Sequence, residues 1–139
     1  MCNRNAAERL FWELVEDFGH WSGRQLALCH DAAPLLPAGA AAIAQTTTHL
    51  IKAATHANRR EWEAAADACL DMAAAALNTL GHGEFTAAKD IIWDMAMAAH
   101  IAAGKDGAMF PEVQREVLHC LRESVGDRAL AYLGPLSAA

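Results

Sequence analysis

Apolar residues recur along the chain at steps of three and four, which is the period of one face of an α-helix. The pattern predicts six helices and a short final one, over residues 5–18, 22–33, 38–57, 59–80, 84–103, 111–125 and 127–133. Gly19, Gly81 and Gly104 follow three of these segments, as expected because glycine is common just after helix C-termini. We therefore expect one all-α domain, a compact bundle of five to seven amphipathic helices over residues 1–134, followed by a loose tail over 135–139.

The composition agrees with a helical fold. Alanine accounts for 33 residues, whereas leucine, isoleucine, valine and phenylalanine together account for 28. Alanine is the best helix former and is depleted in strands, so a β-sandwich or a β-barrel is disfavoured. Because its side chain is small, alanine also lets two helix axes approach closely, and we expect alanine-rich packing seams between the helices.

Neither a membrane segment nor a common metal site is predicted. No apolar run reaches the length of about 20 residues that a membrane-spanning helix needs, and four acids within the first 20 residues argue against a signal peptide. The four cysteines stand at positions 2, 29, 69 and 120, without the close pairs typical of zinc sites. We expect reduced thiols in a cytoplasmic protein. No motif indicates a cofactor or points to a known family.

The net negative charge comes from one quarter of the chain. Residues 61–94 carry seven acids and one base, whereas the remainder carries ten of each, so this segment accounts for the whole charge of −6. An acidic surface repels phosphate backbones, and direct binding of a nucleic acid is therefore not expected. The same surface attracts basic proteins, which makes a basic protein the favoured class of partner.

The fifth predicted helix is apolar on nearly all sides. One face consists of Phe85, Ala88, Ile92, Met95, Ala96 and Ala99. On the other side stands a second apolar stripe of Trp93, Met97 and Ile101, and it is interleaved with the polar residues Asp90, Asp94 and His100. A helix of this kind is either central in the bundle or buried against a partner. Tryptophan and methionine are enriched in interfaces, and two aspartates are costly to bury, so both interpretations stay open.

The fourth predicted helix carries a row of acids. Glu63, Asp67 and Asp71 follow one another at a spacing of four residues, where like charges repel by roughly a few tenths of a kcal/mol per pair. A solvated face is the simplest interpretation, and a surface complementary to a basic partner is the second. A metal-binding ridge lacks a converging histidine. If the fourth and fifth predicted helices pack as a hairpin, the acidic face of one can adjoin the acidic face of the other and form one continuous acidic surface.

Catalytic motifs are missing from the sequence. It contains no glycine-rich phosphate loop, no His-Glu-x-x-His and no Gly-x-Ser-x-Gly. Ferritin-like dimetal sites need two Glu-x-x-His pairs, and the chain has a single one, Glu116 with His119. This pair lies opposite the apolar residues Val113, Val117 and Leu121 on a helical wheel, so we expect it on the outside of the bundle.

These features favour a non-catalytic interaction protein of the adaptor, immunity or inhibitor type. Its acidic helical surface would meet a basic partner protein, with Trp93 and Met97 as anchors and the acids as steering charges. One form of such a protein blocks a nucleic-acid-binding groove. The candidate partner-binding residues are Asp90, Trp93, Asp94, Met97, Ile101, Glu63, Asp67 and Asp71.

Two alternatives remain open. The first is an enzyme, or a metal- or ligand-binding bundle, whose pocket is assembled from histidines and cysteines that are distant in the sequence. The second is an obligate homodimer in which the stripe of Trp93, Met97 and Ile101 completes a core shared by two chains.

Overall fold

The computed structural model describes residues 4–31, 37–104 and 110–138, and all regular structure in these ranges is helical. Five α-helices are followed by a 3-10 helix: α1 (Arg4–Asp31), α2 (Pro37–Asn58), α3 (Trp62–Thr79), α4 (His82–Ala102), α5 (Phe110–Val125) and η1 (Gly126–Ala138). The expected all-α bundle is confirmed. None of the described helices is both long and apolar enough to cross a lipid bilayer.

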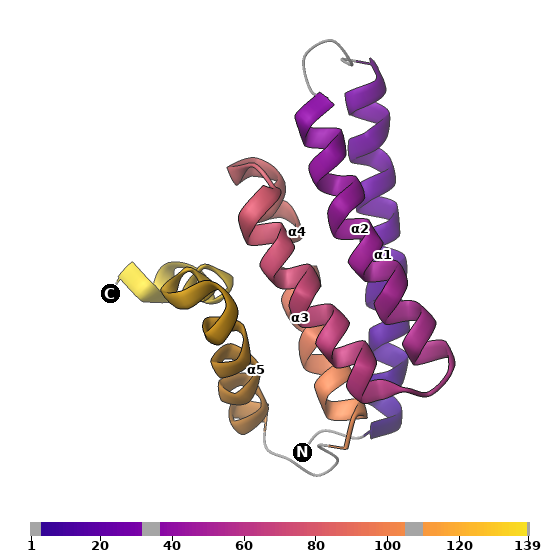
Figure 1. Ribbon diagram of the computed structural model, residues 1–139, viewed down its shortest axis with the longest axis vertical. Coiled ribbons are helices and arrows are strands. Elements are labelled where there is room, and N and C mark those ends of the chain that lie inside the picture. The colour runs from indigo at the N-terminus through magenta and orange to yellow at the C-terminus, as the bar shows by residue number, and fades with distance from the viewer. Residues whose placement is uncertain (1–3, 32–36, 105–109, 139) are drawn as a thin grey trace.

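The helices α3 and α4 form the middle of the bundle. They pack against each other, with α2 against α3 and α1 against α4 on one side, and with α5 and η1 on the other. Figure 1 shows α1 and α2 as a long antiparallel pair whose upper part reaches beyond α3 and α4. It also shows α5 and η1 as a separate pair of elements on the opposite flank, so that α4 is covered from both sides.

The first helix differs from the prediction, because α1 does not end at Gly19. It continues to Asp31 and so joins the two short helices that we expected over 5–18 and 22–33. Phe18 and Trp21 are both buried and extend the apolar face through this point. Glycine inside a helix costs about 0.5–1 kcal/mol relative to alanine, whereas burying one large apolar side chain contributes about 1.5–3 kcal/mol. Packing therefore overrides the local stop signal.

The turns around α3 also differ from the prediction. The helix α3 begins at Trp62 rather than at residue 59, and its N-cap residue Glu61 makes no side-chain capping hydrogen bond. Its carboxylate lies instead 3.0 Å from Nδ1 of His56. At the other end, α3 stops at Thr79, and Gly81 is the N-cap of α4 rather than the end of α3.

Small residues fill much of the interface among α2, α3 and α4. Ala53, Ala65, Ala76, Ala96 and Ala99 are completely buried. The larger core residues come from all five α-helices, and they include Phe11, Ile43, Met72, Ile92 and Leu121. Alanine brings the helix axes together, and the larger side chains fill the remaining space.

The C-terminal elements close the bundle over α3 and α4. Val113, Val117 and Leu121 lie on one face of α5 and are buried, as their spacing predicts. Pro111 stands in the first turn of α5, where its missing N–H group has no cost. The last helix is a 3-10 helix that runs to Ala138, beyond Leu133 where we expected it to end.

Candidate functional site

The apolar stripe on α4 is part of the protein's own core. Trp93, Met97 and Ile101 are 7%, 2% and 5% exposed. The ring of Trp93 stacks on Tyr132 of η1, with 5.8 Å between the ring centroids. The sequence left open whether this helix is central in the bundle or buried against a partner. In the structure α4 is central. Trp93, Met97 and Ile101 are therefore covered by other residues of the same chain in this structure.

The two aspartates of the same helix remain exposed. Asp90 and Asp94 lie on the outer side of α4, so the helix buries its apolar stripe without burying its acids. The pKa of Asp94 is raised above the ordinary range of an aspartate, first by partial desolvation and second by the negative charge of Asp90. This pair is therefore locally repulsive, and a cation placed beside it would relieve the repulsion.

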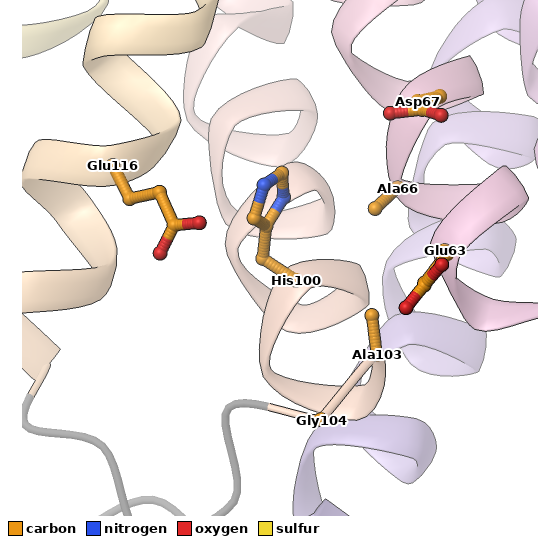
Figure 2. A pocket seen from close by; sticks show the side chains of 7 residues that line it. All are labelled: Glu63, Ala66, Asp67, His100, Ala103, Gly104 and Glu116. Carbon is orange, nitrogen blue, oxygen red and sulfur yellow. The ribbon is translucent and has the colours of Figure 1, made fainter.

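An open hollow of about 450 Å³ lies between α3, α4 and α5. Three of the residues that line it are acids, Glu63 and Asp67 from α3 and Glu116 from α5. Its floor includes His100, which is 8% exposed. Figure 2 shows the carboxylate of Glu116 pointing toward the imidazole of His100, with Asp67 and Glu63 across the hollow on α3.

Small residues leave the space open. Ala66, Ala103 and Gly104 complete the lining, and none of them has a side chain larger than a methyl group. The helices α3 and α4 run in opposite directions, so the first turns of α3 stand beside the last turn of α4 (Figure 2). This arrangement brings together residues from three elements that are distant in the sequence.

The charges around Cys120 show how closely the acids of α3 and α5 approach. The pKa of the Cys120 thiol is raised, first by burial and then by the negative charges of Glu116, Glu123 and Asp67. The first two acids belong to α5 and the third to α3, so one acidic surface spans the junction of these helices. We call Glu63, Asp67, Asp71 and Glu116 the acidic band. Asp71 is exposed one turn beyond Asp67 on α3 and does not line the hollow.

The sequence suggested one group of acids on α3 and a second group on α4, and only the first group contributes to the hollow. Glu63 and Asp67 line the hollow, whereas Asp90 and Asp94 are not among its lining residues. The sequence pattern did not predict that Glu116 and His100 lie beside Glu63 and Asp67. Glu116 does point away from the core face of α5, as predicted, but the outer edge of α5 is turned toward α3. No local signal reports this, since it depends on how α5 docks.

The described residues include two of the four cysteine side chains, Cys69 and Cys120. In the described part of the chain, no group of three or more His, Cys, Asp and Glu side chains is placed to hold a metal ion. Cys69 is completely buried, and burial raises the pKa of its thiol to about 12, so it is a poor nucleophile. Cys2 and the side chain of Cys29 lie outside the described residues.

Comparison of the chain with protein-family models, with curated proteins and with solved structures found no match.

Proposed function

We propose that this protein is a non-catalytic binding protein that takes a basic side chain of a partner protein into the hollow between α3, α4 and α5. One observation carries the proposal. Three carboxylates from two helices, Glu63, Asp67 and Glu116, line a single open hollow. Convergent negative charge of this kind matches a cation that arrives from outside.

The chemistry of the lining suits an arginine or a lysine. Both side chains have a long aliphatic part that packs against apolar surface while the charged end stays polar. Ala66 and Ala103 offer such surface inside the hollow. Arginine has the better fit, because its planar guanidinium group donates several hydrogen bonds at once to carboxylates.

The charges outside the hollow support association with a basic protein. The exposed acids Asp71, Asp90 and Asp94 belong to the segment that accounts for the whole net charge of −6. Such charges accelerate encounter with a positive surface and lose this effect when salt screens them. The proposed role is thus recognition through the hollow and steering through the remaining acids. A nucleic-acid-binding protein is one kind of partner with a basic surface, and blocking it would make this protein an inhibitor.

The experiment compares two pairs of charge reversals in the full chain. Asp67→Lys with Glu116→Lys changes the hollow, whereas Glu13→Lys with Asp17→Lys makes the same change in net charge on the exposed side of α1. Each protein is immobilised and used to capture partners from an extract of its native source at low and at high salt. Circular dichroism verifies that both variants fold.

We expect the unmodified chain and the α1 variant to retain the same basic protein and to release it in high salt. The hollow variant should lose it at every salt concentration. If both variants lose the partner equally, the interaction depends on net charge alone. If both variants retain it equally, the hollow is not the binding site. Addition of nucleic acid tests the inhibitor version, because it should compete only if the partner uses one basic surface for both.

A further inference from the structure

The C-terminal helix η1 is an unusual element to find at the edge of a core. It is a 3-10 helix of 13 residues, whereas 3-10 runs longer than about 3–4 residues are uncommon because their hydrogen bonds have poorer geometry. An element of this kind depends on its tertiary contacts. In the described part of η1, Ala129 and Tyr132 are buried and most of the other residues are not.

One of these contacts joins Arg128 to the end of α3. Its Nη2 donates a hydrogen bond of 2.7 Å to the carbonyl oxygen of Leu77, and its Nη1 donates one of 2.8 Å to Oδ1 of Asn78. Leu77 lies in the last turn of α3, where carbonyl groups have no partner within the helix and a positive charge is favourable. The guanidinium group therefore caps α3 from outside.

The second contact is made by Tyr132, one turn further along η1. Its hydroxyl group donates a hydrogen bond of 2.6 Å to the carbonyl oxygen of Ala73 in α3. Its ring packs between two aromatic residues of α4, edge-on to Phe85 at 5.0 Å and stacked on Trp93 at 5.8 Å. Tyr132 thus fills a slot whose polar end belongs to α3 and whose aromatic walls belong to α4.

These contacts have the form of a bound peptide. Among the described residues, the side chains that donate hydrogen bonds from η1 to α3 are an arginine and a tyrosine four residues apart. Asp90 and Asp94 are exposed on α4, the helix that also supplies Phe85 and Trp93. A segment with a cation and an aromatic ring at this spacing fits the slot, and the exposed acids of α4 favour its approach to this helix.

We propose that residues 126–133 form a releasable strap in a groove between α3 and α4. When the strap is released, this groove binds a segment of a partner protein that carries an arginine and a tyrosine. Release of the strap would expose Trp93 and Phe85, which its Tyr132 now covers. The strap and the incoming segment compete for the same contacts, so the strap sets the affinity of the groove. This inference does not depend on the acidic hollow, which lies at the opposite end of α3.

Hydrogen exchange of the full chain tests the release. We compare the unmodified protein with Arg128→Ala and use Arg115→Ala, an exposed arginine of α5, as the matched control. The strap amides should exchange faster than those of α3 in the unmodified protein. Arg128→Ala should accelerate strap exchange by about tenfold, the change expected from losing the hydrogen bonds of one charged group, and leave α3 unchanged. Arg115→Ala should change neither.

Peptide binding tests the groove. The probe is a fluorescent peptide with the sequence of residues 126–133, and the control peptide has alanine in place of its arginine and tyrosine. We expect the probe to bind the Arg128→Ala chain about tenfold more tightly than the unmodified chain, because the weakened strap competes less well. The control peptide should bind neither. Tyr132→Phe offers a second weakened strap that keeps the aromatic contacts, in case Arg128→Ala does not fold.

Two results would overturn the proposal. If the strap exchanges only together with α3 in every variant, it is an integral part of the fold and is not released. If the probe peptide binds all chains equally, or binds none of them, no groove exists that the strap occupies.

Discussion

The placement of Trp93 in the core leads to a large predicted loss of stability for Trp93→Ala. The side chain is 7% exposed, and it stacks on Tyr132. Replacing a buried phenylalanine or tryptophan by alanine costs about 3–5 kcal/mol, of which an aromatic pair accounts for about 0.5–1.5 kcal/mol. A natural domain has a total stability of about 5–15 kcal/mol. The substitution should therefore remove a large part of the stability of this protein.

Trp12 provides the matched control, because it is the same residue type but is 39% exposed on α1. Trp12→Ala should cost about 1 kcal/mol, as is usual for partly exposed positions. Both variants and the unmodified chain are unfolded in urea and followed by far-ultraviolet circular dichroism. The slopes of the transitions should be similar, so that the midpoints compare stability directly.

The same measurement distinguishes a core within one chain from a core shared by two. We expect the urea midpoint of the unmodified protein to be independent of protein concentration. A midpoint that falls on dilution would mean that assembly stabilises the fold. If Trp93→Ala costs no more than Trp12→Ala, then α5 and η1 do not cover the stripe and the assignment of Trp93 to the core is refuted.

Three further predictions concern the backbone, the alanine packing and pH. Gly19→Ala should raise the free energy of unfolding by about 0.5–1 kcal/mol, because a Cβ there meets nothing within 4 Å and α1 is continuous. A Cβ at Gly126 also meets nothing within 4 Å, but the residue has a φ of +66°, so Gly126→Ala should lower the free energy of unfolding by about 1 kcal/mol or more. Thermal unfolding measures both, and a loss at Gly19 would mean that α1 is interrupted. Ala96→Leu should lower the free energy of unfolding by about 1–3 kcal/mol, because it overpacks a completely buried position. The control Ala44→Leu, on the exposed side of α2, should have little effect on the urea midpoint. Equal effects of the two substitutions would argue against tight packing of the alanines between the helices. Because the pKa of Asp94 is raised in the folded protein, the folded state binds more protons than the unfolded chain, and this residue makes the free energy of unfolding fall as the pH rises through its folded pKa. Asp94→Asn should therefore be more stable than the unmodified chain above that pKa and lose its advantage in acid; a constant difference across the pH range would contradict this assignment.

Local signals predict some of the helices well. The boundaries of α4 and α5 agree with the prediction to within two residues, because Gly104 and Pro111 mark them. The same kind of signal fails at Gly19, which lies inside α1. The difference is tertiary, since Trp21 finds a place in the core and its burial outweighs the preference of glycine to end a helix.

The exposure of the α4 stripe could not be predicted from the pattern. Trp93 and Met97 lie on a helix with apolar residues on most of its sides, and such a helix needs cover from several directions. The sequence does not say whether α5 and η1 supply that cover or a second protein does. Here Tyr132, which carries no special local signal, completes the enclosure of Trp93.

The sequence predicts only part of the acidic hollow. The row of Glu63 and Asp67 follows from helical periodicity alone. Their convergence with Glu116 and His100 depends on the antiparallel packing of α3 with α4 and on the docking angle of α5. These are long-range properties, which a helical wheel of one element does not contain.

Binding of a positively charged side chain in the hollow is the central claim, and a nuclear magnetic resonance titration tests it most directly. Isotope-labelled protein is titrated with a short peptide that has a single arginine, and in parallel with the same peptide carrying the uncharged isostere citrulline. The proposal predicts saturable shifts of the amides around Glu63, Asp67, His100 and Glu116 with the arginine peptide only. Equal shifts with both peptides, or shifts spread over the whole acidic surface without saturation, would contradict it.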